Sequence, residues 1–303
     1  MVYYSASAYA PPKHHQILSW NFKNPEMNGN LSSTFHPLQT FASTAETSDA
    51  FAYIGVDDDR KEIIVAFKGT NGTLDALHDI VTSLDNVLHY VDLCEITSEV
   101  KFNIHKGFCW YYQSLLESGL MNAFVGVTSK FPDYQVMATG HSLGGALASI
   151  FAFHAASSEP NGNQIKVYTF GSPRVGDTGF AKAFNSLGIE SWRVVHWKDI
   201  VVHMAPCCSG FFGLGPCDAD GNGCPFHFGG EAFYGDGMNK DPLAICDLDL
   251  YEGVRYHVDY FGIRVGNFAT VKPDPARERE QADELAAYLA THGSRPVGLP
   301  GRL

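Results

Sequence analysis

The chain has 303 residues, of which 45% are hydrophobic and 18% are charged, and this balance excludes an intrinsically disordered protein. Its net charge of −12 excludes the basic surface that nucleic-acid binders need, so we expect no nucleic-acid partner. The most apolar stretch, residues 143–153, is too short to span a bilayer, and the sequence does not open on a recognisable signal peptide.

Predicted strands and helices alternate along the chain. Apolar runs predict strands at residues 52–56, 62–67, 134–139, 165–170 and 192–197, with a hairpin turn at residues 57–59. Helical spacing and helix-end signals predict helices at residues 74–88, 108–130, 143–157, 177–187 and 275–290. This alternation predicts an α/β protein whose central sheet is mostly parallel and flanked by helices.

The chain divides into a main domain at residues 1–272 and a C-terminal helix with a flexible tail at residues 273–303. The regular pattern fades after residue 206 and returns near residue 256. Five of the seven cysteines lie in this region: Cys207, Cys208, Cys217, Cys224 and Cys246. We interpret them as a disulfide-tied loop in an oxidising compartment, and a reduced intracellular protein is the alternative.

Two patterns resemble metal sites but lack the spacing that such sites need. Residues 218–223 begin like a calcium-binding EF-hand loop, but Pro225 interrupts it and Gly229 stands where the loop requires Glu. The clustered cysteines lack the Cys-x-x-Cys spacing of zinc sites. We therefore expect neither a metal nor another cofactor.

The strongest chemical signal is Gly-His-Ser-Leu-Gly at residues 140–144. It falls between a predicted strand and a predicted helix, as the nucleophile elbow of a hydrolase requires. Such a tight turn exposes the hydroxyl of Ser142, and Gly140 and Gly144 leave room for the neighbouring main chain. The following helix directs its N-terminal N–H groups at developing negative charge. Ser142 is the candidate nucleophile, and a helix N-cap without chemistry is the alternative.

Several motifs in order give the chain a resemblance to the class 3 lipases, the fungal-type branch of the α/β-hydrolases. The pieces are EIIVAFKGT, HKGF, VMATGHSLGGALA, VYTFGSPRVG, VVHWKDIVVHMAP and YHVDYFG. They belong to a likeness that runs from about Ala8 to Gly262. It implies the α/β-hydrolase fold with a lid segment and a Ser-Asp-His triad. The family usually has Arg where Lys68 stands, but Thr70, the implied oxyanion residue, is kept.

The elbow motif also predicts that the acid follows the nucleophile in the chain. Asp199 follows the predicted strand at residues 192–197, and open α/β sheets place their sites at the carboxyl ends of strands. Asp177 is the rival acid, although its position also suits the start of a helix.

The base must follow the acid, and four histidines do so: His203, His227, His257 and His292. His203 is too close to Asp199 in sequence to reach round to the nucleophile. His227 lies in the cysteine-rich region and His292 in the tail. His257 matches the His-x-x-Tyr piece of the resembling family and is the candidate base.

Two further sets of residues complete the candidate site. The N–H of Leu143, the residue after the nucleophile, is one oxyanion donor by the elbow rule, and the resemblance adds Thr70. In the family, the segment after Thr70 holds a lid that covers the site until it meets lipid. The candidate lid residues are Leu74, Leu77 and Ile80, and packing of this apolar stripe into the core is the alternative.

The function expected from these residues is that of a serine hydrolase. The leading interpretation is a secreted triacylglycerol lipase that cleaves acylglycerol esters through an acyl-enzyme and contacts a lipid–water interface transiently. A feruloyl-type esterase and a phospholipase A1 would use the same machinery, and a catalytically silent binding protein is the alternative from a different class. Oligomeric state is left open, and the sequons at Asn30 and Asn71 matter only after secretion.

Overall fold

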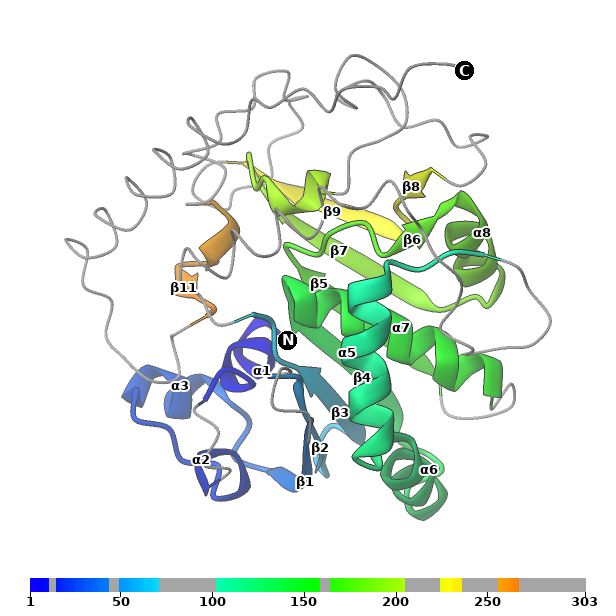
Figure 1. The fold of residues 1–303 in the computed structure, drawn as a ribbon. Helices are drawn as coiled ribbons and strands as arrows, with labels where there is room; N and C mark the ends of the chain where they lie inside the picture. The colour runs from blue at the N-terminus through cyan, green and yellow to red at the C-terminus, as the bar shows by residue number, and fades with distance from the viewer. Residues whose placement is uncertain are drawn as a thin grey trace, which may run out of the picture.

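The computed structural model describes residues 1–10, 15–43, 49–70, 102–158, 164–204, 224–235 and 256–266. Its main sheet has seven strands in the order β1-β2-β3-β4-β5-β7-β9 (Figure 1). They are β1 (Phe35–Ala42), β2 (Phe51–Asp57), β3 (Glu62–Phe67), β4 (Gln135–His141), β5 (Ile165–Phe170), β7 (Glu190–His196) and β9 (Gly230–Tyr234). Strands β1 to β3 are antiparallel neighbours, and β3, β4, β5, β7 and β9 are parallel. The predicted α/β fold with a mostly parallel sheet is confirmed.

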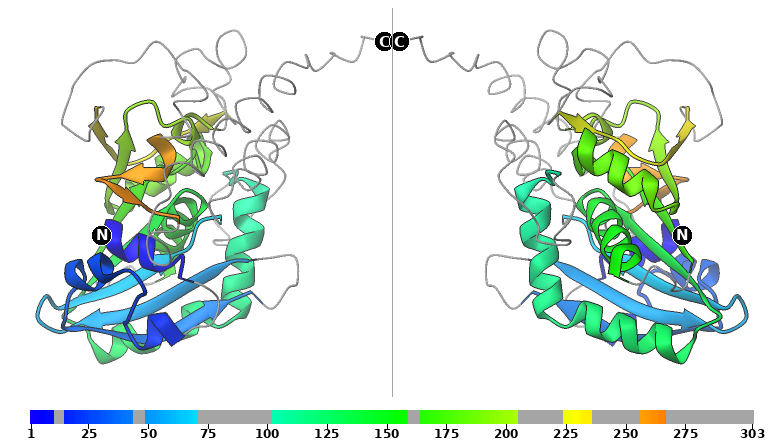
Figure 2. Two further views of the ribbon diagram at one scale, coloured as in Figure 1. Left: turned by 90° about the vertical axis from the view of Figure 1, so that its left-hand side faces the viewer. Right: turned by 90° about the vertical axis from the view of Figure 1, so that its right-hand side faces the viewer.

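Helices cover both faces of this sheet (Figures 1 and 2). One face carries α1 (Val2–Ser7), α2 (His15–Leu18) and α3 (Pro25–Asn30). The other carries α5 (Lys106–Glu117), α6 (Leu120–Lys130), α7 (Leu143–Ser158) and α8 (Thr178–Ser186). The shorter elements are β6 (Gly176–Asp177), the 3₁₀ helix η2 (Val201–His203), β8 (Pro225–Phe226), β10 (Asp259–Tyr260) and β11 (Ile263–Arg264).

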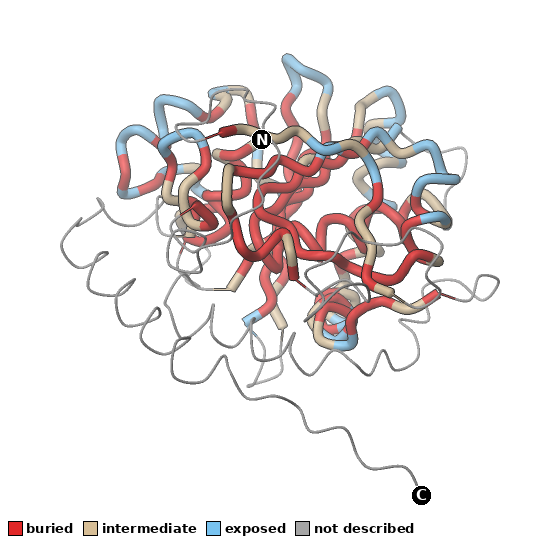
Figure 3. The backbone as a smooth tube through the Cα atoms, turned by 90° about the horizontal axis from the view of Figure 1, so that it is seen from above, coloured by how far each residue is buried: buried red, intermediate tan, exposed pale blue. Residues whose placement is uncertain are grey.

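Alternate residues of the central strands contribute to two separate hydrophobic cores. In β3, Ile63 and Val65 pack with helices α5 to α8, whereas Ile64 and Ala66 pack with the N-terminal helices. All four side chains are fully buried. Strands covered on both faces need apolar residues at nearly every position, which explains the continuous runs in the sequence. Figure 3 shows these buried strands at the centre and exposed turns around them.

The single helix predicted at residues 108–130 is wrong, because the chain forms two helices there. Gly119 has a φ of +93°, and its N–H donates to the Leu116 carbonyl over 2.9 Å. A left-handed glycine in this position ends a helix and turns the chain, so α6 starts anew at Leu120. The apolar period continues across the break and conceals it in the sequence.

Several expectations fall beyond the described residues. These are the helices at 74–88 and 275–290, the lid residues Leu74, Leu77 and Ile80, the C-terminal region at 273–303, and four cysteines of the expected disulfide-tied loop, Cys207, Cys208, Cys217 and Cys246. Within the described ranges, Cys109 and Cys224 are each disulfide-bonded. No helix in the described part of the chain is long and apolar enough to cross a membrane. The same residues contain no group of three or more His, Cys, Asp or Glu side chains that could hold a metal ion.

Candidate active site

Ser142 stands in the turn between β4 and α7. Its φ of +58° lies in the left-handed region, which a non-glycine residue occupies only under constraint. Its N–H donates to the Phe170 carbonyl at the end of β5 over 2.9 Å. A Cβ on Gly140 would collide with the main chain of Gly144, and one on Gly144 would collide with the Phe67 carbonyl. The turn therefore has the strained strand–turn–helix geometry that the motif predicts.

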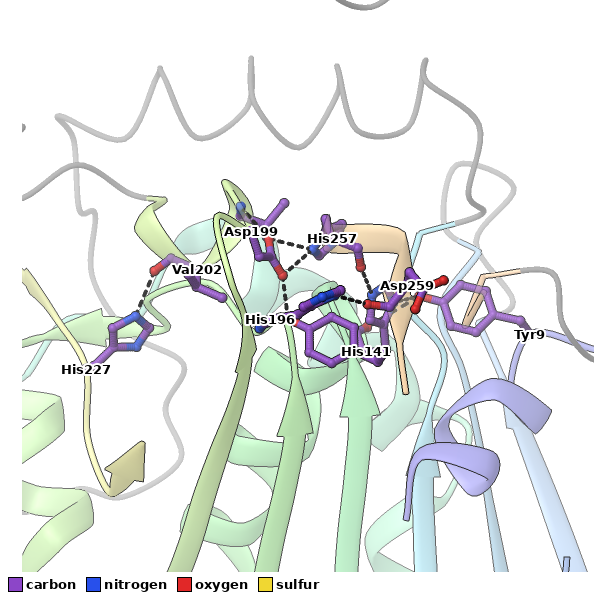
Figure 4. A network of polar contacts seen from close by, with 10 residues as sticks. Tyr9, His141, His196, Asp199, Val202, His227, His257 and Asp259 are labelled. Carbon is purple, nitrogen blue, oxygen red and sulfur yellow. Dashed lines mark hydrogen bonds and ion pairs between the residues drawn. The ribbon is translucent and has the colours of Figure 1, made fainter. Parts of the chain in front are cut away.

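Asp199 and His257 form a buried, hydrogen-bonded pair (Figure 4). His257 Nδ1 lies 3.0 Å from Oδ1 and 3.0 Å from Oδ2 of Asp199. The Tyr260 hydroxyl donates to Oδ2 over 2.5 Å, and the Val201 N–H donates to Oδ1 over 2.8 Å. Burial raises the pKa of Asp199, but His257 and these two donors outweigh it and leave the pKa lowered. Asp199 is therefore a carboxylate that holds the proton of His257 on Nδ1.

Gly171 connects the Ser142 turn with this pair. It follows Phe170, whose carbonyl binds the Ser142 N–H, and its φ is +59°. A Cβ at this position would lie 2.6 Å from Asp199 Oδ2 and 2.8 Å from His257 Nδ1. Only glycine leaves space for the pair here. The structure thus places Ser142 and Asp199 beyond the carboxyl ends of the parallel strands β4 and β7, where α/β sheets place their sites, and brings His257 to Asp199 from a separate segment.

A second histidine, His141, lies against His257. The two rings stack with centroids 4.7 Å apart at an angle of 29°. His141 Nε2 lies 2.7 Å from the His257 carbonyl oxygen, and His141 Nδ1 lies 2.9 Å from the Tyr9 hydroxyl (Figure 4). Burial, followed by the nearby His257, lowers the pKa of His141 to about 3. No role was predicted from the sequence for His141 or Tyr9, and the only signal was the place of His141 inside the Gly-x-Ser-x-Gly motif.

Asp177, the other candidate acid, caps the N-terminus of helix α8. Its Oδ1 accepts the Phe180 N–H at the start of α8 over 2.8 Å. Its Oδ2 accepts from the main-chain N–H of Asn103 over 3.1 Å and from the Asn103 side chain over 2.8 Å. The helix-start interpretation of Asp177 matches these contacts.

The other candidate bases are placed differently. His227 Nε2 donates to the Val202 carbonyl over 2.8 Å, a contact that supports the loop after Asp199. Burial and the nearby arginines lower the pKa of His227 well below its usual range, so this ring is a neutral donor. His203 belongs to η2 on the same loop as Asp199. His292 lies outside the described residues.

The two oxyanion candidates lie on segments that touch. Leu143 is the first residue of α7, and N–H groups in the first turn of a helix have no acceptor within that helix. A Cβ on Gly144 would lie 2.9 Å from the Gly69 nitrogen, so the start of α7 packs directly on the loop that leads to Thr70. Thr70 itself is partly exposed.

Lys68 stands where the class 3 lipases, the family that the sequence resembles, usually have Arg. Its Nζ lies 2.7 Å from Asp49 Oδ2, and its main-chain N–H donates to the Phe51 carbonyl over 2.9 Å. Lys68 is therefore a paired cation with a main-chain link to β2, two residues before the candidate oxyanion residue Thr70.

Comparison with known proteins identifies relatives of this chain. The family model described as Lipase (class 3) matches residues 64–209, which include Ser142 and Asp199. "Lipase ZK262.3" of Caenorhabditis elegans is 30% identical over 299 residues, which cover 89% of this chain and 80% of the relative. "Lipase" of Rhizopus niveus is 28% identical over 241 residues, or 76% of this chain, and the match spans about half of that relative, 55% of its length.

Solved structures show the same likeness in three dimensions. The Rhizomucor miehei triacylglyceride lipase superposes with a TM-score of 0.68 at 25% sequence identity. The match covers 89% of this chain and 94% of that structure. Because it extends over nearly the whole of both chains, the expected α/β-hydrolase fold is confirmed.

Proposed function

The chain belongs to the class 3 lipase family of carboxylic ester hydrolases, and from that premise we propose that it cleaves acylglycerol esters with Ser142, Asp199 and His257 as its catalytic triad. The observation that carries the assignment is the buried Asp199–His257 pair beside the strained Ser142 turn. The likeness to a triacylglyceride lipase supports acylglycerols as the substrate class.

The reaction follows from the placement of the protons. His257 Nδ1 is bonded to Asp199, so its Nε2 is the nitrogen that accepts the Ser142 proton as the hydroxyl attacks the ester carbonyl. Asp199 then stabilises the imidazolium. The Leu143 N–H and Thr70 donate to the tetrahedral oxyanion. His257 returns the proton to the leaving alcohol, and water cleaves the acyl-enzyme to release the fatty acid.

We also propose that the protein is secreted and acts at a lipid–water interface. The disulfide-bonded Cys109 and Cys224 favour an oxidising compartment. Leu74 and Leu77 would supply apolar surface for the lipid contact, because a net charge of −12 provides no attraction to anionic lipid. Replacing both leucines with Ser should reduce activity on emulsified triglyceride much more than activity on a soluble short ester. Equal losses on the two substrates would identify them as core residues instead.

Hydrolysis of tributyrin below and above its solubility limit tests the main proposal. The wild-type protein should release butyrate, with a steeper rate once droplets form. Ser142→Ala should lose about 10⁶-fold in turnover with an unchanged circular dichroism spectrum. A tenth of the wild-type rate in Ser142→Ala would refute the triad. Preferential turnover of methyl ferulate or phosphatidylcholine would refute the acylglycerol assignment, and no turnover of any ester would favour a binding protein.

A further inference from the structure

The segment that carries His257 is not part of the main sheet. Among the described residues, β10 pairs with β11 alone, so no strand ladder ties this segment to β4, β5 or β7. Two ring nitrogens of residues in the main sheet bind its main chain. His141 Nε2 lies 2.7 Å from the His257 carbonyl, and His196 Nδ1 lies 2.6 Å from the Asp259 carbonyl (Figure 4). The position of the base therefore depends in part on side chains that reach out from β4 and β7.

We propose that His141 is a positioning residue that holds the catalytic base His257 through its main-chain carbonyl, and that Tyr9 fixes the tautomer of His141 that can do so. The inference rests on the triad assigned above.

The hydrogen-bonding groups permit one arrangement of protons. A carbonyl oxygen only accepts, so His141 Nε2 must carry a proton to bind the His257 carbonyl. The lowered pKa of His141 keeps the ring neutral, with a single N–H, so Nδ1 must be an acceptor. The Tyr9 hydroxyl, 2.9 Å from Nδ1, is the donor that it meets. In the other tautomer, two acceptors would face each other across 2.7 Å at His257.

Tyr9 is itself held in place at the oxyanion loop. Burial raises the pKa of Tyr9, and a hydrogen bond between its hydroxyl and the Gly69 main chain partly offsets that rise. A Cβ on Gly69 would collide with that hydroxyl. One line of buried hydrogen bonds thus runs from Gly69 through Tyr9 and His141 to His257. Gly69 adjoins Thr70 in the chain and His141 adjoins Ser142, so these hydrogen bonds position His257 relative to the nucleophile and to the oxyanion residue.

Substitutions can distinguish whether His141 only fills space or acts as a hydrogen-bond donor. His141→Phe keeps an aromatic ring to stack on His257 but removes the Nε2 donor. His141→Gln loses the ring, yet its side-chain amide nitrogen reaches about as far as Nε2 and can donate to the same carbonyl. Tyr9→Phe removes only the hydroxyl. Tyr53→Phe is its matched control, because the buried Tyr53 hydroxyl hydrogen-bonds Ser7 over 2.7 Å in the same core.

The experiment measures kcat and KM for p-nitrophenyl butyrate, with thermal unfolding of each variant. His141→Phe should lower kcat by about 10- to 100-fold with KM within about twofold, since a displacement of about 1 Å can cost 100-fold. His141→Gln should recover most of this loss. Tyr9→Phe should lower kcat by about 3- to 10-fold, the equivalent of one hydrogen bond. Tyr53→Phe should lose a similar amount of thermal stability while keeping wild-type kcat.

Three results would overturn the proposal: wild-type kcat in His141→Phe, a His141→Gln variant as slow as His141→Phe, or equal kcat losses in Tyr9→Phe and Tyr53→Phe. If His141→Phe does not fold, the two tyrosine variants still decide the question. Failure of the triad itself is recognised separately, because wild-type protein would then show no ester turnover or Ser142→Ala would retain it.

Discussion

Replacing Asp199 with Asn should disable turnover, because every acceptor position of this carboxylate faces a donor. Val201 N–H binds Oδ1, the Tyr260 hydroxyl binds Oδ2, and His257 Nδ1 lies 3.0 Å from both. An amide group on either side therefore points a donor at a donor. Facing His257, it favours the tautomer with the proton on Nε2, and this ring cannot accept the Ser142 proton. The expected loss in kcat is about 10⁴-fold, or about 5 kcal/mol of transition-state stabilisation.

Asp177→Asn is the matched control, since it makes the same change in another buried carboxyl. Asn caps helices about as well as Asp, so the bond from the Phe180 N–H to Oδ1 persists. The new amide faces both donors of Asn103, whose side chain can rotate while its main-chain N–H loses its acceptor. The cost is about 1–3 kcal/mol of folding stability, with kcat unchanged.

Steady-state hydrolysis of p-nitrophenyl butyrate and thermal unfolding by circular dichroism separate the two effects. Asp199→Asn should be inactive and folded, and Asp177→Asn should be active with an unfolding temperature lower by a few degrees. An inactive Asp177→Asn beside an active Asp199→Asn would show that the acid is wrongly assigned. Full activity in both variants would reduce the Asp199–His257 pair to a structural contact.

Three other predictions follow from the same geometry. Because the pKa of Asp199 is lowered on folding, its charge stabilises the fold above the usual Asp value of about 4, and that stability is lost as pH falls through the folded pKa. Tyr260→Phe removes a charged hydrogen bond worth about 1.5–3 kcal/mol, so acid unfolding followed by tryptophan fluorescence should move to higher pH. Gly171→Ala should lower both stability and kcat. Its control is Gly188→Ala, which should lower stability alone, because Gly188 has a φ of +67° but nothing within 4 Å of an added Cβ. Equal kcat losses in the two variants would contradict this prediction. In flotation assays at low salt, the protein should bind anionic vesicles more weakly than zwitterionic ones, and a gap that persists at high salt would rule out net charge as the cause.

The inner part of the sheet was predictable, whereas its edges were not. Strands β2 to β4 are covered on both faces, so they appear in the sequence as short apolar runs. Strand β1 contains Pro37 and a register shift between Pro37 and Gln39, and β9 begins with Gly230 and has no fully buried residue. Edge strands tolerate proline and glycine because part of their main chain needs no ladder partner. Their sequences therefore resemble loops.

The geometry of the candidate site was predictable where it depends on residues that are neighbours in the chain. The turn at Ser142 needs residues that are neighbours in the chain, and five positions specify it. Asp199 and His257 lie 58 residues apart, so their contact could be expected only from chain order and family resemblance. The role of Gly171 had no signal at all, because the collision that it avoids involves residues from two other segments.

Strand periodicity predicts the face of the sheet on which the His141 side chain lies, but not its partners. Alternate residues of β4 share a face, so Met137, Thr139 and His141 point the same way. Met137 belongs to the core under the N-terminal helices, and Thr139 hydrogen-bonds Ser5 of α1 over 2.8 Å. Alternation alone thus separates the His141 side chain from the face that α7 covers. What the sequence does not contain is the packing of the N-terminal residues on that face, which brings the Tyr9 hydroxyl to His141 from 132 residues away and, in the proposal above, selects the ring nitrogen that carries the proton.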